Sequence, residues 1–236
     1  MKISINILAW NTISTTSLAI DILKKDLKDI EHEIIVVDQG SKDGCQDMAT
    51  IKNVQNMGIS VGKNQGIEAS KGEYILMLDG DVVPVPNSVI CLMNYMDEHP
   101  DVHALGMYPD KWVRSIHEYD YQEYCHKLDP VVPHITGKHQ GWCCYYGMYR
   151  RKIFDEGLRF DESFGPGYGW EDCDFANQMQ ERGIQQWVAG INHKCGKYLH
   201  KINSSIRCMG YEKYMETSKD RGRHFSEKWN TMAGLC

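Results

Sequence analysis

The chain has 236 residues, which is long enough for one large domain or two fused halves around a hydrophobic core. Hydrophobic residues make up 42% of the chain and charged residues 25%, so the composition is that of a globular protein and argues against intrinsic disorder. The net charge of −6 argues against a protein that coats nucleic acid, and no apolar run approaches the roughly 20 residues of a transmembrane helix.

Cysteine usage and the first residues of the chain indicate where the protein works. The nine cysteines are odd in number and irregularly spaced, and none forms a C-x-x-C pair of the kind that holds zinc. The adjacent Cys143 and Cys144 are too constrained for an ordinary disulfide, so reduced thiols are expected. Residues 1–11 are too short and too soon polar to be a secretion signal. These features predict a cytoplasmic protein without a transmembrane segment.

The charge is unevenly distributed. Residues 194–224 hold eight Lys and Arg against three Asp and Glu, so this segment is basic and the remainder of the chain is acidic. One interpretation is the solvated face of a C-terminal helix. The other is a basic rim that meets a phosphate, an anionic acceptor or a membrane surface, which would make the protein peripheral to a membrane.

The first half of the chain alternates between apolar runs and helical patterns. The uninterrupted β-branched run at 34–37 suits a parallel strand that helices cover on both faces. A Ser/Thr cluster after Asn11 is expected to cap the first helix. Strands are predicted at 3–8, 34–37, around Val54, at 74–78 and at 102–107, and helices at 18–27, 58–70 and 88–96. The alternation predicts an α/β fold with a doubly wound, mostly parallel sheet, whose ligand site lies beyond the carboxyl ends of the strands.

From about residue 109 the pattern changes. Residues 109–140 are rich in aromatic, histidine and charged side chains, and we expect them to shape a pocket. The elements predicted after them are a strand at 140–149, a helical turn at 151–156, a glycine-rich loop at 160–169, a helix at 170–182 and a strand at 186–191. Because no repeat or flexible linker interrupts the chain, residues 1–108 and 109–236 are predicted to be two halves of one domain.

Two aspartates, Asp79 and Asp81, follow the buried strand predicted at 74–78 and flank Gly80. Two like charges at such a place repel each other, which is tolerable only with a bound cation or a raised pKa. Oxygen ligands suit Mg²⁺ or Mn²⁺, whereas the alternative is an ordinary surface turn. Asp38 ends the strand at 34–37 in the same way, so both strand ends point to a ligand site.

A second acidic group begins the helix at 170–182, directly after the glycine-rich loop. Acidic residues there complement the helix dipole, but a carboxylate at this position could also take a proton from a sugar hydroxyl. His193 follows the last predicted strand and could complete a metal shell with Asp81, and His200 competes with it for this role. Most lone histidines are ordinary surface or hydrogen-bonded residues, so this assignment depends on its context.

Taken in order, these segments resemble the inverting glycosyltransferases of family 2, which have a GT-A fold. Each motif is weak alone, but their order and spacing over most of the chain are specific. The matching segments are 8–11 (L-A-W-N), 37–44 (V-D-Q-G-S-K-D-G), 56–66, 72–81, 141–142 (G-W), 160–162 (F-D-E) and 169–174 (G-W-E-D-C-D). The resemblance implies a Rossmann-like N-terminal half for the nucleotide sugar and a C-terminal half for the acceptor.

The resemblance also implies roles for the matched residues. The residues implied to bind the nucleotide-sugar donor are Leu8, Ala9, Asn11, Asp38, Gln39, Lys63, Asp79 and Gly80. The implied ligands of Mn²⁺ or Mg²⁺ are Asp81, Asp79 and His193, and the implied acceptor-binding residues are Trp142, Trp170 and Glu171. Asp172 is the implied catalytic base.

Some positions depart from the family pattern. Gln39 stands where a second aspartate is frequent, which loosens the argument for a uridine donor, so a UDP-sugar is favoured and a GDP-sugar is the alternative. Lys63 replaces a frequent arginine and offers a point charge instead of a bidentate contact. The chain also lacks the Q-x-x-R-W signature, which predicts a non-processive enzyme.

The function expected is metal-dependent, inverting transfer of a sugar from a nucleoside diphosphate to the hydroxyl of a glycan, lipid-linked sugar or protein. A nucleic-acid acceptor is less favoured because the chain is acidic overall. The rival functions are a non-catalytic nucleotide-sugar or glycan-binding protein and a sugar-phosphate nucleotidyltransferase. A dehydrogenase is disfavoured because no G-x-G-x-x-G follows the first strand.

Overall fold

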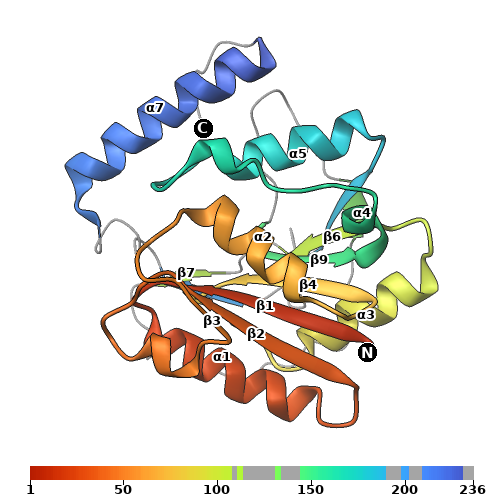
Figure 1. Cartoon of the computed structure of the whole chain (residues 1–236). Helices are drawn as coiled ribbons and strands as arrows, with labels where there is room; N and C mark the ends of the chain where they lie inside the picture. The colour runs from red at the N-terminus through yellow and green to blue at the C-terminus, as the bar shows by residue number, and fades with distance from the viewer. Residues whose placement is uncertain (108–110, 114–130, 134–143, 190–197, 202–208, 231–236) are drawn as a thin grey trace.

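The computed structural model describes residues 1–107, 111–113, 131–133, 144–189, 198–201 and 209–230. Over these residues the chain forms an eight-stranded sheet, a second sheet of three strands, and helices on both faces of the large sheet (Figure 1). The large sheet contains β1 (Ile3–Ala9), β2 (His32–Asp38), β3 (Ile51–Lys52), β4 (Tyr74–Asp79), β6 (Ala104–Met107), β8 (Val131–Pro133), β9 (Tyr146–Arg150) and β10 (Gln186–Ala189). The small sheet contains β5 (Val82–Pro84), β7 (Lys111–Val113) and β11 (Tyr198–Lys201). The helices are α1 (Ile13–Asp26), α2 (Ile59–Ala69), α3 (Ser88–Glu98), α4 (Arg151–Asp155), α5 (Glu171–Glu181) and α7 (Tyr211–Trp229), with 3₁₀ turns η1 (Cys45–Met48) and η3 (Glu162–Phe164).

The large sheet is mixed, with the strand order β3-β2-β1-β4-β9-β6-β10-β8. Strands β3, β2, β1 and β4 run parallel to one another, and β10 runs parallel to β6. Strand β9 lies antiparallel between β4 and β6, and β8 lies antiparallel to β10. The α/β class and the mostly parallel, doubly wound N-terminal half are confirmed. The antiparallel β9 brings strands from beyond residue 109 into the same sheet.

The register of the parallel strands brings the two predicted strand ends together. In β1, Leu8 pairs with Val37 of β2 on one side and with Asp79 of β4 on the other, and Ala9 pairs with Asp38. Both aspartates therefore lie at the carboxyl edge of the sheet, on either side of β1. This is where ligands bind in open α/β sheets.

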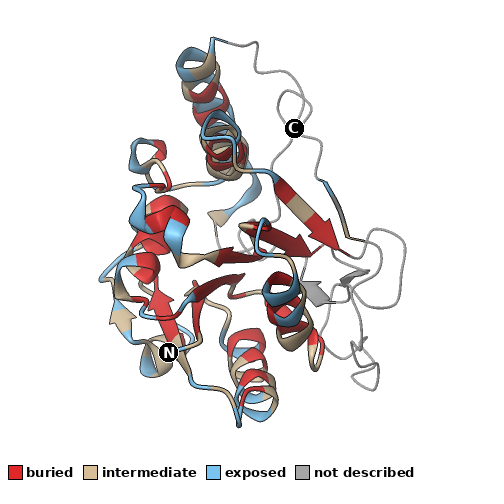
Figure 2. Ribbon diagram, turned by 90° about the vertical axis from the view of Figure 1, so that its right-hand side faces the viewer, coloured by how far each residue is buried: buried red, intermediate tan, exposed pale blue. Residues whose placement is uncertain are grey.

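Helices cover both faces of the large sheet. Helices α1 and α3 lie on one face, and α2, α4 and α5 lie on the other (Figure 1). The alternation of side chains along β4 supplies both cores, because Leu76 and Leu78 join the first cluster while Ile75 and Met77 join the second. Buried residues concentrate in the strands and on the inner faces of the helices (Figure 2).

Helix α7 forms a further layer outside α5 (Figure 1). Near its C-terminal end, Lys228 Nζ lies 2.6 Å from Asp161 Oδ2 and 2.7 Å from Asp174 Oδ1. Trp229 Nε1 donates to the same Asp174 oxygen at 2.9 Å, and Phe225 is fully buried. The fully buried Asp174 is therefore an anchor for α7 and not an exposed carboxylate.

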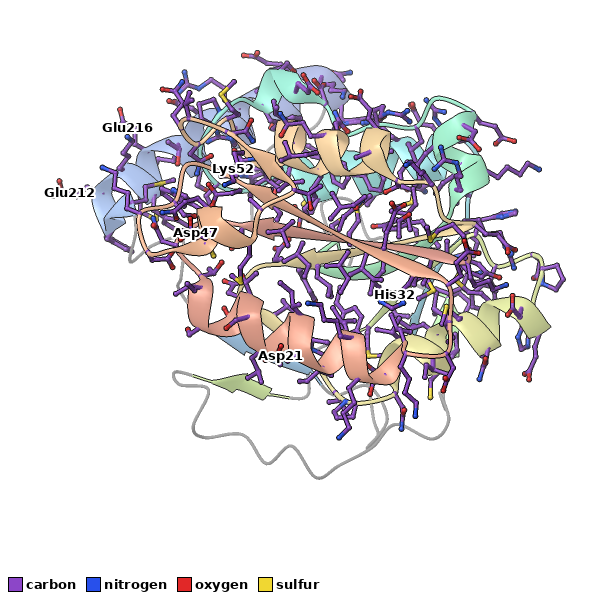
Figure 3. All side chains as sticks on the ribbon, turned by 60° about the horizontal axis from the view of Figure 1, so that its bottom comes forward. Asp21, His32, Asp47, Lys52, Glu212 and Glu216 are labelled. Carbon is purple, nitrogen blue, oxygen red and sulfur yellow. The ribbon has the colours of Figure 1, made fainter. Side chains whose placement is uncertain are left out.

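The other face of α7 meets solvent. Glu212 and Glu216 are exposed and project from its N-terminal part (Figure 3). Arg221 is only 6% exposed, so the basic segment is not simply a solvated helix face. The rest of that segment, at 194–197 and 202–208, lies outside the described residues.

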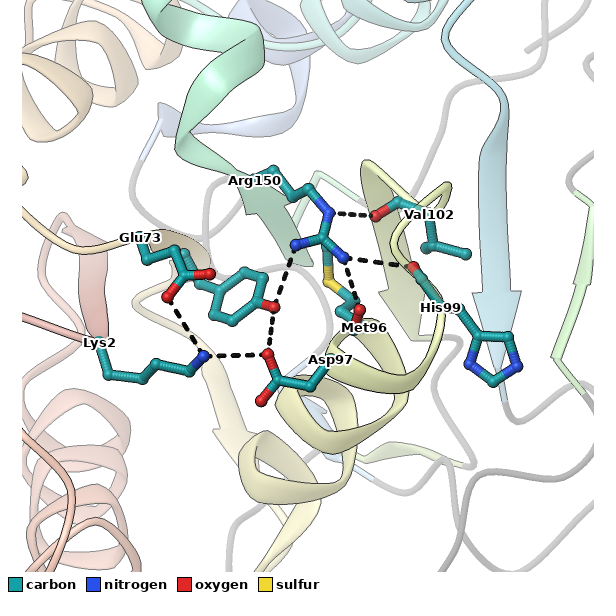
Figure 4. A network of polar contacts seen from close by, with 8 residues as sticks. Lys2, Glu73, Met96, Asp97, His99, Val102 and Arg150 are labelled. Carbon is teal, nitrogen blue, oxygen red and sulfur yellow. Dashed lines mark hydrogen bonds and ion pairs between the residues drawn. The ribbon is translucent and has the colours of Figure 1, made fainter.

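A polar network closes the opposite edge of the sheet, where the parallel strands begin (Figure 4). Lys2 Nζ lies 2.9 Å from Asp97 Oδ1 and 3.2 Å from Glu73 Oε2, and Tyr74 OH donates to Asp97 at 2.6 Å. Arg150 donates to Tyr74 OH and to three backbone carbonyls at the end of α3 and beyond it. The network joins β4, β9 and α3, so its charges hold the fold together far from the carboxyl edge.

Several element boundaries differ from the predictions. Helix α1 begins at Ile13 instead of residue 18, and the strand expected around Val54 is β3, while Val54 itself is 98% exposed. Strand β9 begins at Tyr146, and residues 140–143 lie outside the described residues. In the described part of the chain, no helix combines the length and apolar character needed to cross a bilayer.

Candidate active site

The Asp-Gly-Asp turn after β4 is clamped from two sides. Gly80 N donates to Leu8 O at 2.7 Å, and the hydroxyls of Thr15 and Thr16 donate to Gly80 O at 2.6 and 3.2 Å. A Cβ at position 80 would lie 2.4 Å from Thr12 Oγ1, so only glycine fits. The Ser/Thr cluster was expected to cap α1, but no side-chain cap hydrogen bond forms there. The two threonines instead hold the turn after β4.

Asp38 forms the neighbouring wall at the end of β2. Its Oδ2 accepts hydrogen bonds from the backbone N–H groups of Gly40 at 3.0 Å and Ser41 at 3.1 Å. Asn11 N donates to Ser41 Oγ at 2.8 Å, which joins the loops after β1 and β2. The second carboxylate oxygen, Asp38 Oδ1, is buried and has no hydrogen-bond partner. A buried acceptor without a partner marks a place for a ligand donor.

Gln39 connects the same loop to the start of α2. Its backbone N–H donates to Ala9 O at 2.9 Å, and its Oε1 accepts from Met57 N at 2.8 Å. Its Nε2 is buried without a partner, and it lies against α2 where a Cβ on Gly62 would come within 2.1 Å. The amide thus uses its oxygen to hold the loop before α2 and keeps two unused N–H donors.

Lys63 and Asp79 form an ion pair beneath the Asp-Gly-Asp turn. Lys63 Nζ lies 3.1 Å from Asp79 Oδ1 and donates to the backbone oxygen of Cys144 at 2.7 Å, with its side chain 5% exposed. Burial alone would lower the pKa of Lys63, but the charges of Asp79 and, further away, Glu171 outweigh it and raise this pKa. The ammonium therefore stays charged and neutralises Asp79. Lys63 thus makes its two contacts with Asp79 and the Cys144 carbonyl, and neither needs a bound donor.

The N-terminus of α5 brings two more carboxylates to this cluster. Glu171 and Asp172 are half-buried, and the backbone N–H of Cys173 donates to Asp172 Oδ1 at 2.8 Å. Burial raises the pKa of both carboxyl groups, and each is also acted on by the charge of Lys63, which lowers its pKa. The Asp172 charge raises the pKa of Glu171 further. The structure thus brings Asp79, Lys63, Glu171 and Asp172 together, as the resemblance implied for a catalytic centre.

The glycine-rich loop before α5 is held between α2 and α7. A Cβ on Gly58, at the start of α2, would lie 2.5 Å from Gly165 O, so the two backbones touch. Arg221 of α7 donates from Nη2 to the same Gly165 oxygen at 2.9 Å, and its guanidinium occupies the space that a Cβ on Gly167 would need. The loop is thus fixed by contacts from both halves of the chain.

Trp170 ends this loop with a positive φ of 76°. Its ring lies 5.1 Å from that of Phe225, and a Cβ on Gly222 would meet it at 3.1 Å. Trp170 is half-buried, and its indole packs against α7. Its predicted contact with an acceptor stays a prediction.

Asn64 is hydrogen-bonded to the Phe-Asp-Glu segment at 160–162, a contact that the sequence did not predict. Asn64 Oδ1 accepts from Phe160 N at 3.0 Å, and its Nδ2 donates to Phe160 O and to Glu162 Oε1, both at 2.9 Å. Two matching hydrogen bonds to one backbone position fix the segment 160–162 against α2. This asparagine follows Lys63 on α2, so the helix that carries the ion pair also holds the segment 160–162.

The predicted metal site is partly described. Asp81 is half-buried, whereas His193 and Trp142 lie outside the described residues, as does most of the aromatic stretch 109–140. Among the described residues, no group of three or more His, Cys, Asp or Glu side chains is arranged to hold a metal ion. Asp81, a candidate ligand among the described residues, fits a cation such as Mn²⁺ or Mg²⁺ that takes one or two carboxylates and completes its shell with phosphates and water.

Replacing Glu171 should make stability less dependent on pH. A carboxyl group with a raised pKa in the folded state holds its proton longer than in the unfolded state, so stability falls as pH rises between the two pKa values. We expect Glu171→Gln to be about 1 to 2 kcal/mol more stable than the wild type near pH 9 and nearly equal near pH 5. Thermal unfolding of the variant and the wild type at both pH values measures this difference. If the two proteins were equally stable at pH 9 as well as at pH 5, the pKa of Glu171 would not be raised.

The fold has counterparts among solved structures. The crystal structure of S. aureus TarS 1-349 matches with a TM-score of 0.64 and 18% identity, over 98% of this chain and 71% of that one. The structure of the same protein in complex with UDP-GlcNAc has a TM-score of 0.65 and 18% identity, over 98% and 72%. The carboxyl-edge site and this likeness define the class, an α/β protein with the GT-A fold of glycosyltransferases.

The family follows from the sequence itself. The profile of glycosyl transferase family 2 matches residues 4–158, more than half of the chain, and the chain belongs to this family. The match includes Asp38, Lys63 and the Asp-Gly-Asp turn. Glu171 and Asp172 lie beyond it, so their assignment depends on the motif at 169–174 and on the geometry above.

Two curated relatives share a shorter stretch. The cholesterol galactosyltransferase of Borreliella burgdorferi is 34% identical over 91 residues, which are 34% of this chain and 25% of that protein. The poly(ribitol-phosphate) beta-N-acetylglucosaminyltransferase TarP of Staphylococcus aureus is 26% identical over 98 residues, or 37% of this chain and 30% of that protein. The matched part thus spans less than a third of either relative.

Proposed function

We propose that the protein is a metal-dependent, inverting glycosyltransferase that moves a sugar from a UDP-sugar to an acceptor hydroxyl. The observation that carries this proposal is the convergence of the Asp79–Lys63 pair with Glu171 and Asp172 at the carboxyl edge of the sheet. Family membership and the UDP-GlcNAc complex of TarS support the donor class. The unpaired Asp38 Oδ1 can accept the ring N–H of uracil, and the unpaired Gln39 Nε2 can donate to a base oxygen.

Asp172 is the catalytic base in this proposal. A carboxylate whose pKa is raised by burial is a stronger base. Asp172 would remove the proton of the acceptor hydroxyl as the new C–O bond forms. Attack from the face opposite the leaving diphosphate inverts the anomeric carbon in one step. Glu171, whose pKa is raised by burial and by the charge of Asp172, can keep a proton and donate a hydrogen bond to the acceptor. Lys63 holds Asp79 in position for the donor's sugars.

A divalent cation, Mn²⁺ or Mg²⁺, would stabilise the charge on the departing diphosphate when bound. Asp81 would hold it, and His193 is the second candidate ligand. The position of Asp81 directly after the clamped Gly80 supports this role, because the clamp fixes the backbone from which the carboxylate extends.

Asp81→Ala should weaken donor binding only when the cation is present. We expect the Kd for UDP with Mn²⁺ to rise about tenfold or more, with little change when Mn²⁺ is chelated, since a charged ligand is lost. Calorimetry with and without Mn²⁺ measures this, and the exposed Asp21 of α1 provides the control as Asp21→Ala (Figure 3). Unchanged Mn²⁺ dependence in Asp81→Ala would remove Asp81 from the metal site.

A thermal-shift series with UDP-, GDP-, CMP- and dTDP-sugars, each with and without Mn²⁺, tests donor and metal together. We expect the largest rise of the melting temperature with a UDP-sugar and Mn²⁺. Slow Mn²⁺-dependent hydrolysis of the same sugar nucleotide would separate an enzyme from a non-catalytic binding protein. Formation of a sugar nucleotide from a nucleoside triphosphate would indicate the nucleotidyltransferase instead and would sink this proposal.

A further inference from the structure

Three tyrosines form an aromatic surface beside the proposed catalytic centre. Tyr168 of the glycine-rich loop and Tyr214 of α7 have ring centroids 4.7 Å apart, and the rings of Tyr214 and Tyr211 are 6.5 Å apart and nearly parallel at 24°. Tyr211 and Tyr214 share a helix face because they are three residues apart. Tyr168 is 38% exposed and Tyr211 65%, so the tyrosine cluster (Tyr168, Tyr211 and Tyr214) presents rings to solvent.

The cluster begins at the catalytic carboxylates and leads away from them. Burial raises the pKa of Tyr168, and so do the nearby ring of Tyr214 and the charges of Glu171 and Asp172. Tyr168 lies between α7, whose Tyr214 ring it contacts, and the start of α5 at Glu171, which follows it by three residues in the chain. From it the rings continue through Tyr214 to Tyr211 at the N-terminal end of α7, so a long acceptor that reaches Asp172 with one hydroxyl would pass along them.

The position of the cluster is held independently of any ligand. Arg221 donates to Gly165 O and packs against Gly167, while Phe225 buries its ring against Trp170. These contacts fix the loop that carries Tyr168 to the helix that carries the other two tyrosines. Both Tyr168 and α7 lie outside residues 4–158, the part of the chain that matches the family profile.

We propose that the tyrosine cluster is an acceptor subsite that binds the uncharged sugar rings of a glycan. This inference rests on the proposed function and names the acceptor class for the same site. Tyrosine combines a flat apolar ring with a hydroxyl, which matches the apolar face and the hydroxyl edge of a sugar.

The surrounding charge selects against a polyanion. Glu171, Asp172 and Asp79 lie at the inner end of the cluster, and the exposed Glu212 and Glu216 lie at its outer end (Figure 3), beside the exposed Lys213. Arg221 also lies close to Tyr168, but it is only 6% exposed and its guanidinium is bound to Gly165 O. A phosphodiester polymer or a nucleic acid would bring its charges beside these carboxylates, and like charges repel. A neutral oligosaccharide meets no such penalty.

Binding to immobilised oligosaccharides tests the subsite. The probes are neutral gluco-, galacto- and manno-oligosaccharides, with a polyol-phosphate polymer and single-stranded DNA as the polyanionic surfaces. We expect the wild type to be retained on neutral glycans and Tyr211→Ala to bind about threefold to tenfold more weakly, the loss of one ring contact. Tyr211→Phe should keep most of the binding, and Lys219→Ala, an exposed change on the same helix, should bind like the wild type.

Three outcomes would overturn the subsite. They are equal binding by Tyr211→Ala and the wild type, no retention of the wild type on any neutral glycan, and preferential retention on a polyanionic surface. Because Tyr211 is largely exposed, its replacement should leave the fold intact, which the melting temperature checks. Hydrolysis of the UDP-sugar by the wild type tests the proposed function separately, so hydrolysis without glycan binding rejects the subsite alone, and glycan binding without hydrolysis rejects the transferase alone.

Discussion

Asp172→Asn should lower the rate of sugar transfer by about 100-fold to 10,000-fold, because an amide cannot take the acceptor proton. The change keeps the size of the side chain and an oxygen that can still accept the hydrogen bond from Cys173 N. The affinity for UDP should therefore stay close to that of the wild type. Single-turnover transfer and calorimetry with UDP measure the two effects.

A matched control is available on the same helix. Glu181 lies at the far end of α5 and is exposed, so Glu181→Gln removes one carboxylate without touching the site. It should transfer sugar at the wild-type rate. Near-normal transfer by Asp172→Asn would show that the base is another group, for which Glu171 is the next candidate.

Lys63→Met should affect both stability and the dependence of the rate on pH. The substitution leaves Asp79 without its partner beside Glu171 and Asp172, and we expect a loss of about 2 to 3 kcal/mol in the free energy of unfolding. In the wild type, the ammonium of Lys63 lowers the pKa of both Glu171 and Asp172. Without it their pKa values rise, so the acidic limb of the pH–rate profile should move to higher pH.

The control for Lys63→Met lies at the other edge of the sheet. Lys2 is also paired with two carboxylates, Glu73 and Asp97, but within the network of Figure 4. Lys2→Met should lower stability slightly and leave the pH–rate profile in place. If Lys63→Met left both stability and the acidic limb unchanged, its ion pair would have no part in setting the charge of the site.

The sequence was sufficient to predict the sheet and the two strand ends of the donor side. Continuous apolar runs such as 34–37 and 74–78 are typical of buried parallel strands, and an aspartate directly after each run must lie at the carboxyl edge. The direction of β9 was not predictable in this way, because an apolar run has the same pattern in either direction. Its antiparallel course is known only from its pairing with β4 and β6.

The contacts around the predicted site residues could not be predicted from the sequence. Lys63 was assigned to the donor on its motif, but its ion pair with Asp79 depends on the exact placement of α2 against β4. The hydrogen bonds from Thr15 and Thr16 to Gly80 join positions about 65 residues apart, which spacing alone cannot relate. The packing of Trp170 required α7, whose approach to α5 is set by the buried Asp174 and its partners.

The hydrogen bond from Met57 N to Gln39 and the contact between Gly58 and Gly165 form a continuous mechanical link. One end of this link is the amide beside the proposed nucleobase pocket, and the other is the loop that carries Tyr168 and leads to Asp172. Interior and backbone contacts of this kind transmit displacement because they cannot be compressed. A nucleotide that displaced Gln39 would displace the acceptor loop with it, so the affinities for the nucleotide and for the acceptor should each depend on whether the other is bound.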